Sequence, residues 1–221
     1  MSDKNATEIL LERDTTKKVI PFGSGRYQEF AHSDTADVGN PTGIAIQEGE
    51  FLYGLARLIL PNRILETGTN IGISTSYLAL ACQHNGFGTI DTIEHDSTIA
   101  ARAQEKFNKL GFSEIIKIHR QSIESFQVSG MYDLLWLDSE LKLRYGELLR
   151  FWPNIAPGGI ICIHDLWCLE FDEFKGVPED MKKLIRSGDL RAITFQSDHG
   201  VTVFQKRRNI DHLAEITNGS S

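Results

Sequence analysis

Short apolar segments alternate with helix-like patterns along most of this 221-residue chain. The apolar segments have the length of strands, and the helix-like segments repeat apolar residues every three or four positions. The expected strands cover residues 63–67, 88–94, 115–119, 132–137 and 159–164, and the expected helices cover residues 48–60, 73–82, 97–110, 144–155 and 178–187. Two later strand-like runs, 190–196 and 201–205, flank a polar turn and are expected to form a hairpin. The alternation predicts an α/β fold with a mostly parallel sheet and helices on both faces, to which the hairpin adds an antiparallel edge.

The two ends of the chain lack this pattern. Residues 15–46 contain no regular repeat, and a loop of that length is usually functional, so residues 1–46 are expected to form an N-terminal lid. Residues 47–208 are expected to form one domain. Residues 209–221 end in a small polar cluster and are expected to be a flexible tail.

Composition disfavours several classes of protein. The net charge of −7 repels phosphate backbones, which weighs against a nucleic acid partner. No apolar run reaches the roughly 18 residues of a membrane helix, and the mixed-charge N-terminus lacks the apolar core of a signal peptide. The three cysteines are expected to be reduced thiols, with Cys82 and Cys162 in the core and Cys168 in an accessible loop. These features predict a cytoplasmic protein that does not associate with membranes.

The first expected strand passes into its helix through the sequence ILETGTNIGIST, residues 64–75. The strand ends just after Glu66, Gly68 permits a tight turn, and Gly72 lets the helix approach without an intervening side chain. Free backbone N–H groups at the start of the helix favour an anionic group. The second strand ends at Glu94, where a carboxylate can accept hydrogen bonds from both ribose hydroxyls. The two signals together predict a ligand that contains a nucleoside, bound beyond the carboxyl ends of the strands.

Two common nucleotide-binding motifs do not match this turn. It lacks the close first pair of glycines of the dinucleotide fingerprint, and no Gly-Lys-Ser/Thr follows it. The turn has the pattern Glu66-x-Gly68-x-x-x-Gly72, and it is followed by the segments IDTIEHD, LLWLDSE and APGGIICIHDLW. With these motifs the chain resembles the class I S-adenosylmethionine-dependent methyltransferases over residues 45–206. Within that class the chain is most similar to the catechol O-methyltransferase-like and small bacterial O-methyltransferases. The resemblance implies S-adenosylmethionine as the cofactor and a Rossmann-like, seven-stranded sheet of order 3-2-1-4-5-7-6.

The resemblance also implies a role for each residue of these motifs. Glu66 would support the amino group of the methionine moiety, and Ser74 would meet its carboxylate. Glu94 would hold the ribose, and Asp138 would lie next to the sulfonium. The remaining implied cofactor contacts are Gly68, Thr69, Asn70 and Gly72 along the methionine moiety and Gln121 and Ser122 beside the adenine.

In the metal-dependent relatives, two carboxylates and an amide hold a divalent ion such as Mg²⁺, which lowers the pKa of the bound acceptor hydroxyl. Asp138 and Asp165 match the two carboxylates, but Leu166 stands at the third position and cannot coordinate an ion. Two arrangements therefore stay open: a metal held by Asp138 and Asp165, or no metal, with Asp165 or His164 as a general base. Adjacent strand residues point to opposite faces, so His164 is alternatively expected to lie beneath a helix.

The expected activity is methyl transfer to an oxygen of a small hydroxylated molecule, with Asp138, His164 and Asp165 as the catalytic residues. A nitrogen, a sugar hydroxyl or an RNA nucleoside is an alternative acceptor, and the acidic charge weighs against RNA. A further alternative is a catalytically silent module that binds the cofactor, which Leu166 favours. Because relatives of this kind often dimerise, a homodimer is expected.

Overall fold

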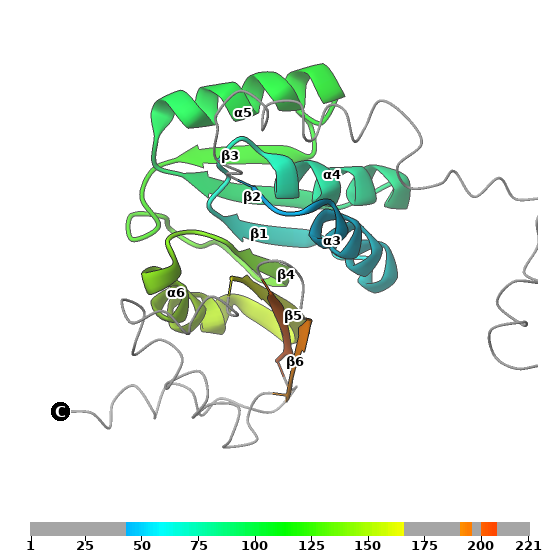
Figure 1. Ribbon diagram of the computed structural model, residues 1–221, viewed down its shortest axis with the longest axis vertical. Helices are drawn as coiled ribbons and strands as arrows, with labels where there is room; N and C mark the ends of the chain where they lie inside the picture. Colours follow the sequence, from blue (N-terminus) through cyan, green and yellow to red (C-terminus); the bar gives the residue numbers. More distant parts are fainter. Residues whose placement is uncertain (1–42, 166–190, 196–199, 207–221) are drawn as a thin grey trace, which may run out of the picture.

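The computed structural model describes residues 43–165, 191–195 and 200–206 (Figure 1). These residues form a seven-stranded sheet in the order β3-β2-β1-β4-β5-β7-β6. The strands are β1 (Arg63–Thr67), β2 (Thr89–Glu94), β3 (Ile116–Arg120), β4 (Tyr132–Leu137), β5 (Ile155–His164), β6 (Arg191–Phe195) and β7 (Val201–Gln205). Strand β7 pairs antiparallel with β5 and β6, and the other neighbours pair in parallel. The α/β class, the strand order and the antiparallel edge predicted from the sequence are confirmed.

Helices cover both faces of the sheet (Figure 1). In the described part of the chain the α-helices are α3 (Ile46–Ile59), α4 (Ile73–Asn85), α5 (Ser97–Leu110) and α6 (Arg144–Phe151). Successive strand residues point to opposite faces of a sheet. Ile64 and Leu134 accordingly join a core with residues of α3, α4 and α5. Their neighbours Leu65 and Leu135 join a second core with residues of α6, so the predicted two-sided cover is confirmed.

The largest difference from the expected boundaries lies between β4 and β5. The sequence pattern predicted a helix over residues 144–155, but α6 ends at Phe151, a 3₁₀ turn covers Trp152–Asn154, and β5 begins at Ile155. Pro153 explains the early end, because proline has no N–H to continue the helical hydrogen bonds and its ring clashes with the preceding turn.

Several expectations concern residues outside the described ranges. The predicted helix 178–187, the tail 209–221 and most of the N-terminal lid fall there, as do Leu166 and Cys168. Residue 46, the last of the expected lid, belongs to α3. Cys82 and Cys162 are buried thiols, as predicted. None of the described helices combines the length and the apolar character needed to cross a membrane.

Candidate active site

The turn between β1 and α4 brings the end of β1 against the end of β4. Gly68 adopts a φ of +81°, and a Cβ added to it would overlap the carbonyl oxygen of Asp138. Gly72 begins α4 at a φ of +78°, and a Cβ there would lie 2.5 Å from the ring of Phe107. Both glycines are therefore required by backbone conformation and by close neighbours within the protein. The tight turn predicted at Gly68 is present, and its contact with the methionine moiety stays a prediction.

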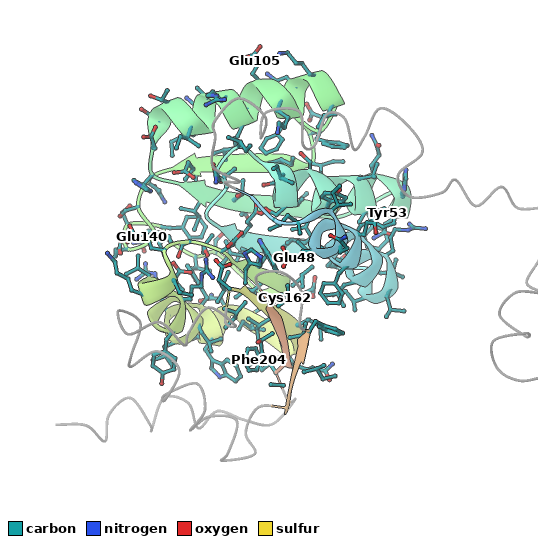
Figure 2. The ribbon with its side chains drawn as sticks, in the orientation of Figure 1. Glu48, Tyr53, Glu105, Glu140, Cys162 and Phe204 are labelled. Carbon is teal, nitrogen blue, oxygen red and sulfur yellow. The ribbon has the colours of Figure 1, made fainter. Side chains whose placement is uncertain are left out.

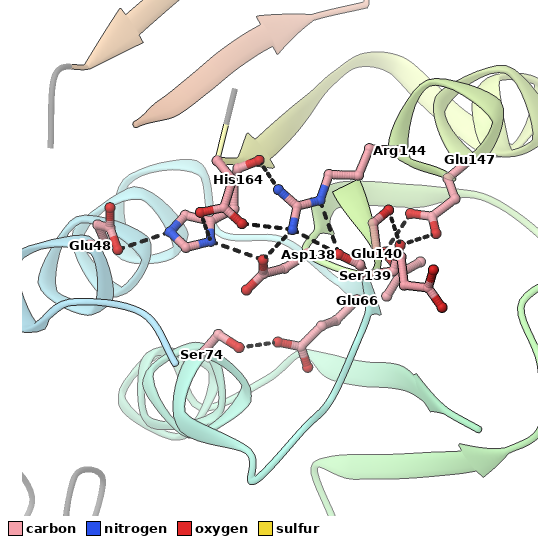
Figure 3. A network of polar contacts seen from close by, with 11 residues as sticks. Glu48, Glu66, Ser74, Asp138, Ser139, Glu140, Arg144, Glu147 and His164 are labelled. Atoms are coloured by element: carbon pink, nitrogen blue, oxygen red, sulfur yellow. Dashed lines mark hydrogen bonds and ion pairs between the residues drawn. The ribbon is translucent and has the colours of Figure 1, made fainter. Parts of the chain in front are cut away.

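Glu66 is fully buried beneath this turn. Its carboxylate accepts hydrogen bonds from the hydroxyls of Ser74 (2.5 Å), Thr75 (2.5 Å) and Thr92 (2.6 Å). Burial raises the pKa of Glu66 to about 7, although the three hydroxyl donors act in the opposite direction. The carboxylate thus orients Ser74 at the first turn of α4 (Figure 3).

Glu94 holds the loops after β1 and β2 together. One carboxylate oxygen accepts from the backbone N–H of Asn70 at 2.9 Å, and the other accepts from the backbone N–H of Asp96 at 3.0 Å. Gln121 and Ser122 follow β3, and the Ser122 carbonyl accepts from the backbone N–H of Ser125 in a turn. Glu94 is therefore a fixed acceptor at the end of β2, whereas Ser122 lies on an exposed turn.

A pocket of about 360 Å³ lies at the carboxyl ends of β1, β4 and β5. Its described lining comes from residues 43–44 before α3, from the turn and the start of α4, and from the residues that follow β4 and β5. The predicted site residues that line it are Gly68, Thr69, Asn70, Ser74, Asp138, His164 and Asp165. The predicted site residues that are not among its described lining are Glu66, Gly72, Glu94, Gln121 and Ser122. The structure thus brings the expected methionine-binding turn and the three expected catalytic residues to one place.

Arg144 lies between the two aspartates (Figure 3). One terminal nitrogen is 3.0 Å from Oδ1 of Asp138, 2.9 Å from Oδ2 of Asp165 and 2.7 Å from the carbonyl oxygen of Ser139. The other terminal nitrogen donates to the carbonyl oxygen of His164. The side chain is only 3 % exposed, so this guanidinium is a buried cation that pairs with both carboxylates.

His164 is buried beneath α3, as the strand alternation predicted, yet its ring also reaches the aspartates. Its Nδ1 is 2.9 Å from Oδ1 of Asp138, and its Nε2 is 3.0 Å from Oε2 of Glu48 in the first turn of α3. Asp165 has a φ of +58°, which ends the strand alternation, and its carboxylate lies 3.5 Å from the same Nδ1. Burial lowers the pKa of His164, but hydrogen bonds to Asp138 and Glu48 and nearby negative charge outweigh burial and raise it to about 10.

The sequence analysis did not identify three residues of the polar network around the pocket, Glu48, Arg144 and Glu147. Glu48 had only been counted within an amphipathic helix, and Arg144 only as a helix start. The helix dipole disfavours a positively charged side chain in the first turn of a helix. The position of Arg144 therefore indicated that its charge pairs with acidic groups outside the helix. Glu147 supports the loop after β4 by accepting hydrogen bonds from the hydroxyls of Thr67 (2.8 Å) and Ser139. Burial raises the pKa of Glu147 as well.

Comparison with known proteins agrees with this architecture. Residues 65–166 match the model of a methyltransferase domain family, Methyltransf_24. A catechol O-methyltransferase of Niastella koreensis is 28% identical over 144 residues, which cover 61% of this chain and 63% of that protein. The chain therefore spans less than two thirds of the length of this relative.

Two solved structures share the fold. A putative O-methyltransferase from Klebsiella pneumoniae superposes with a TM-score of 0.72 at 24% identity, over 86% of this chain and 92% of that one. The O-methyltransferase TomG from Streptomyces achromogenes, in complex with SAM, gives a TM-score of 0.72 at 19% identity, over 94% and 100% of the two chains. The domain match, the relative and the strand order support a class I S-adenosylmethionine-dependent methyltransferase of the O-methyltransferase-like group.

Proposed function

We propose that this protein transfers a methyl group from S-adenosylmethionine to an oxygen of a small hydroxylated molecule. The observation that carries the proposal is the pocket that joins the turn after β1 to the carboxylates after β4 and β5. In an open α/β sheet, ligands bind beyond the carboxyl ends of the strands. The catechol O-methyltransferase relative and the SAM complex of TomG support the same interpretation.

The described residues fit this cofactor in charge and in hydrogen bonding. Gly72 is the N-cap of α4 and has no side chain to cap the first turn, and Ile73 and Ser74 line the pocket. Backbone N–H groups at a helix N-terminus attract anions, so we assign the methionine carboxylate to this position. Asp138 lines the same pocket and offers negative charge to a sulfonium.

We assign the nucleoside to the ends of β2 and β3. The carboxylate of Glu94 is held in place by the backbone N–H groups of Asn70 and Asp96. An ionised carboxylate has about four acceptor positions, so Glu94 can accept from the ribose hydroxyls in addition to these two N–H groups. Gln121 and Ser122, in the turn after β3, are proposed to lie beside the adenine.

S-adenosylmethionine, when bound, supplies a methyl group on a positively charged sulfur. The chain has to hold the acceptor hydroxyl in line with that methyl group and to take its proton. Asp165 is the candidate base. Arg144 contacts Oδ2 of its carboxylate, which leaves Oδ1 as the proton acceptor, and the side chain is 24 % exposed in the pocket. His164 does not suit this role, because both ring nitrogens face carboxylates and the ring is charged at neutral pH.

The proposal is tested by incubating the protein with S-adenosylmethionine and a panel of catechols, other small phenols, amines, sugars and nucleosides. Methyl ethers of the hydroxylated compounds, detected by mass spectrometry together with S-adenosylhomocysteine, are the expected products. Products methylated only on nitrogen, on sugars or on nucleosides would favour the alternative acceptors. Cofactor binding without turnover on any acceptor would favour the silent module.

Three further expectations belong to this proposal. We place the catalytic domain at residues 47–208, which the match to residues 65–166 supports. We propose a homodimer, which sedimentation velocity would test. We also propose that the protein acts in the cytoplasm, which cell fractionation would test.

A further inference from the structure

Every nitrogen of the Arg144 guanidinium donates a hydrogen bond inside the pocket wall. The acceptors are the carboxylates of Asp138 and Asp165 and the carbonyl oxygens of Ser139 and His164. A guanidinium fits two carboxylates well because its donors lie in one plane and its charge is permanent. The pair of aspartates predicted to hold an ion therefore already has a cation between its members, supplied by the chain.

The third group near this pair is also unsuited to a metal ion. Asp138, His164 and Asp165 each offer one ligand atom within 4.8 Å of the others. A histidine binds a metal through the lone pair of a neutral ring nitrogen. In His164, Nδ1 is 2.9 Å from Asp138 and Nε2 is 3.0 Å from Glu48, so carboxylates engage both ring nitrogens. A divalent ion placed here would meet the fixed positive charge of Arg144.

We propose that Arg144 takes the place of the divalent ion in this site, so that the wild-type protein holds no metal between Asp138 and Asp165. The guanidinium offsets part of the negative charge of the two carboxylates and orients them toward the pocket, and Arg144 is therefore a positioning residue. The inference concerns the same pocket as the proposed function, but it rests on the contacts of Arg144 and His164 and not on the binding of the cofactor. A metal-binding measurement can therefore contradict it and leave the methyltransferase assignment intact.

The test is the binding of Mn²⁺, measured by electron paramagnetic resonance with and without S-adenosylhomocysteine. Wild-type protein is expected to bind no stoichiometric Mn²⁺ and to keep its thermal melting temperature when Mn²⁺, Mg²⁺ or a chelator is added. Stoichiometric binding to the wild type that is lost in Asp165→Asn would overturn the inference. These measurements on the wild type do not depend on the folding of any Arg144 variant.

The Arg144→Gln variant tests whether the guanidinium takes the place of a divalent ion. Removal of the guanidinium leaves two carboxylates with the oxygen ligands that Mn²⁺ accepts, so Mn²⁺ affinity should rise by about tenfold or more. Arg150→Gln is the matched control, because Arg150 lies on the same helix but is exposed and donates to the carbonyl oxygens of Glu124 and Phe126. If folded Arg144→Gln binds Mn²⁺ no better than Arg150→Gln, the guanidinium does not stand in the place of an ion.

Discussion

Replacement of Glu94 by alanine tests whether the end of β2 holds the ribose. Glu94 is 7% exposed, and its two oxygens are oriented by N–H donors at 2.9 and 3.0 Å. Two ribose hydroxyls that each donate to a charged acceptor would contribute about 1.5–3 kcal/mol apiece, and part of this is returned when water fills the space. We therefore expect Glu94→Ala to weaken the binding of S-adenosylhomocysteine by about 2–3 kcal/mol, or about 30- to 140-fold in Kd.

Isothermal titration calorimetry with S-adenosylhomocysteine measures this change directly. Glu105→Ala is the matched control, because it removes the same charge from the outer face of α5, where the side chain is 67% exposed (Figure 2). Circular dichroism of both variants shows whether the fold is retained. Equal affinities in a folded Glu94→Ala and in Glu105→Ala would refute the assignment of the ribose to Glu94.

Three further changes examine the site residues one at a time. Asp165→Asn keeps the shape but removes the proton acceptor, so turnover on an accepted hydroxyl compound should fall by about tenfold or more with little change in cofactor affinity; unchanged turnover would exclude Asp165 as the base. Gly68→Val should lower the free energy of unfolding by roughly 2–5 kcal/mol, because its side chain would overlap Asp138 at a φ of +81°. Gly86→Val, at a φ of +79° in open space, is the control in thermal denaturation, and equal losses would contradict the overlap. The raised pKa of His164 stabilises the fold fully below its ordinary value of 6.5, and this contribution is lost as the pH rises through about 10. His164→Gln should remove that part of the pH dependence of unfolding, and a curve parallel to wild type would count against the charged ring.

Much of the fold could be predicted because it depends on local patterns. The apolar segments and helical repeats identified the strands of the parallel sheet, and the helix expected over residues 97–110 has the same bounds as α5, which Gly111 terminates. The end of α6 was misplaced because the apolar periodicity continues through Trp152 and Ile155, whereas Pro153 interrupts the backbone hydrogen bonds. The order of the strands came from the family resemblance, since local patterns do not specify which strands are neighbours.

The polar network of the site was much harder to predict, because its contacts join distant parts of the chain. Glu48 and His164 are 116 residues apart, and Arg144 and Asp165 are 21 apart. No spacing rule links such pairs. The sequence therefore indicated the two carboxylates but did not indicate which positively charged group lies between them. The close approach of Gly68 to Asp138 was also not predictable, because Asp138 follows β4 and lies 70 residues further along the chain.

The central claim is that the pocket after β1, β4 and β5 binds S-adenosylmethionine, and a crystal structure with S-adenosylhomocysteine tests it most directly. We predict electron density for the ligand over residues 68–74, with its carboxylate at the start of α4 and its ribose hydroxyls within hydrogen-bonding distance of Glu94. Density for the ligand at any other place on the protein, or a pocket that stays empty at a saturating concentration, would contradict the account.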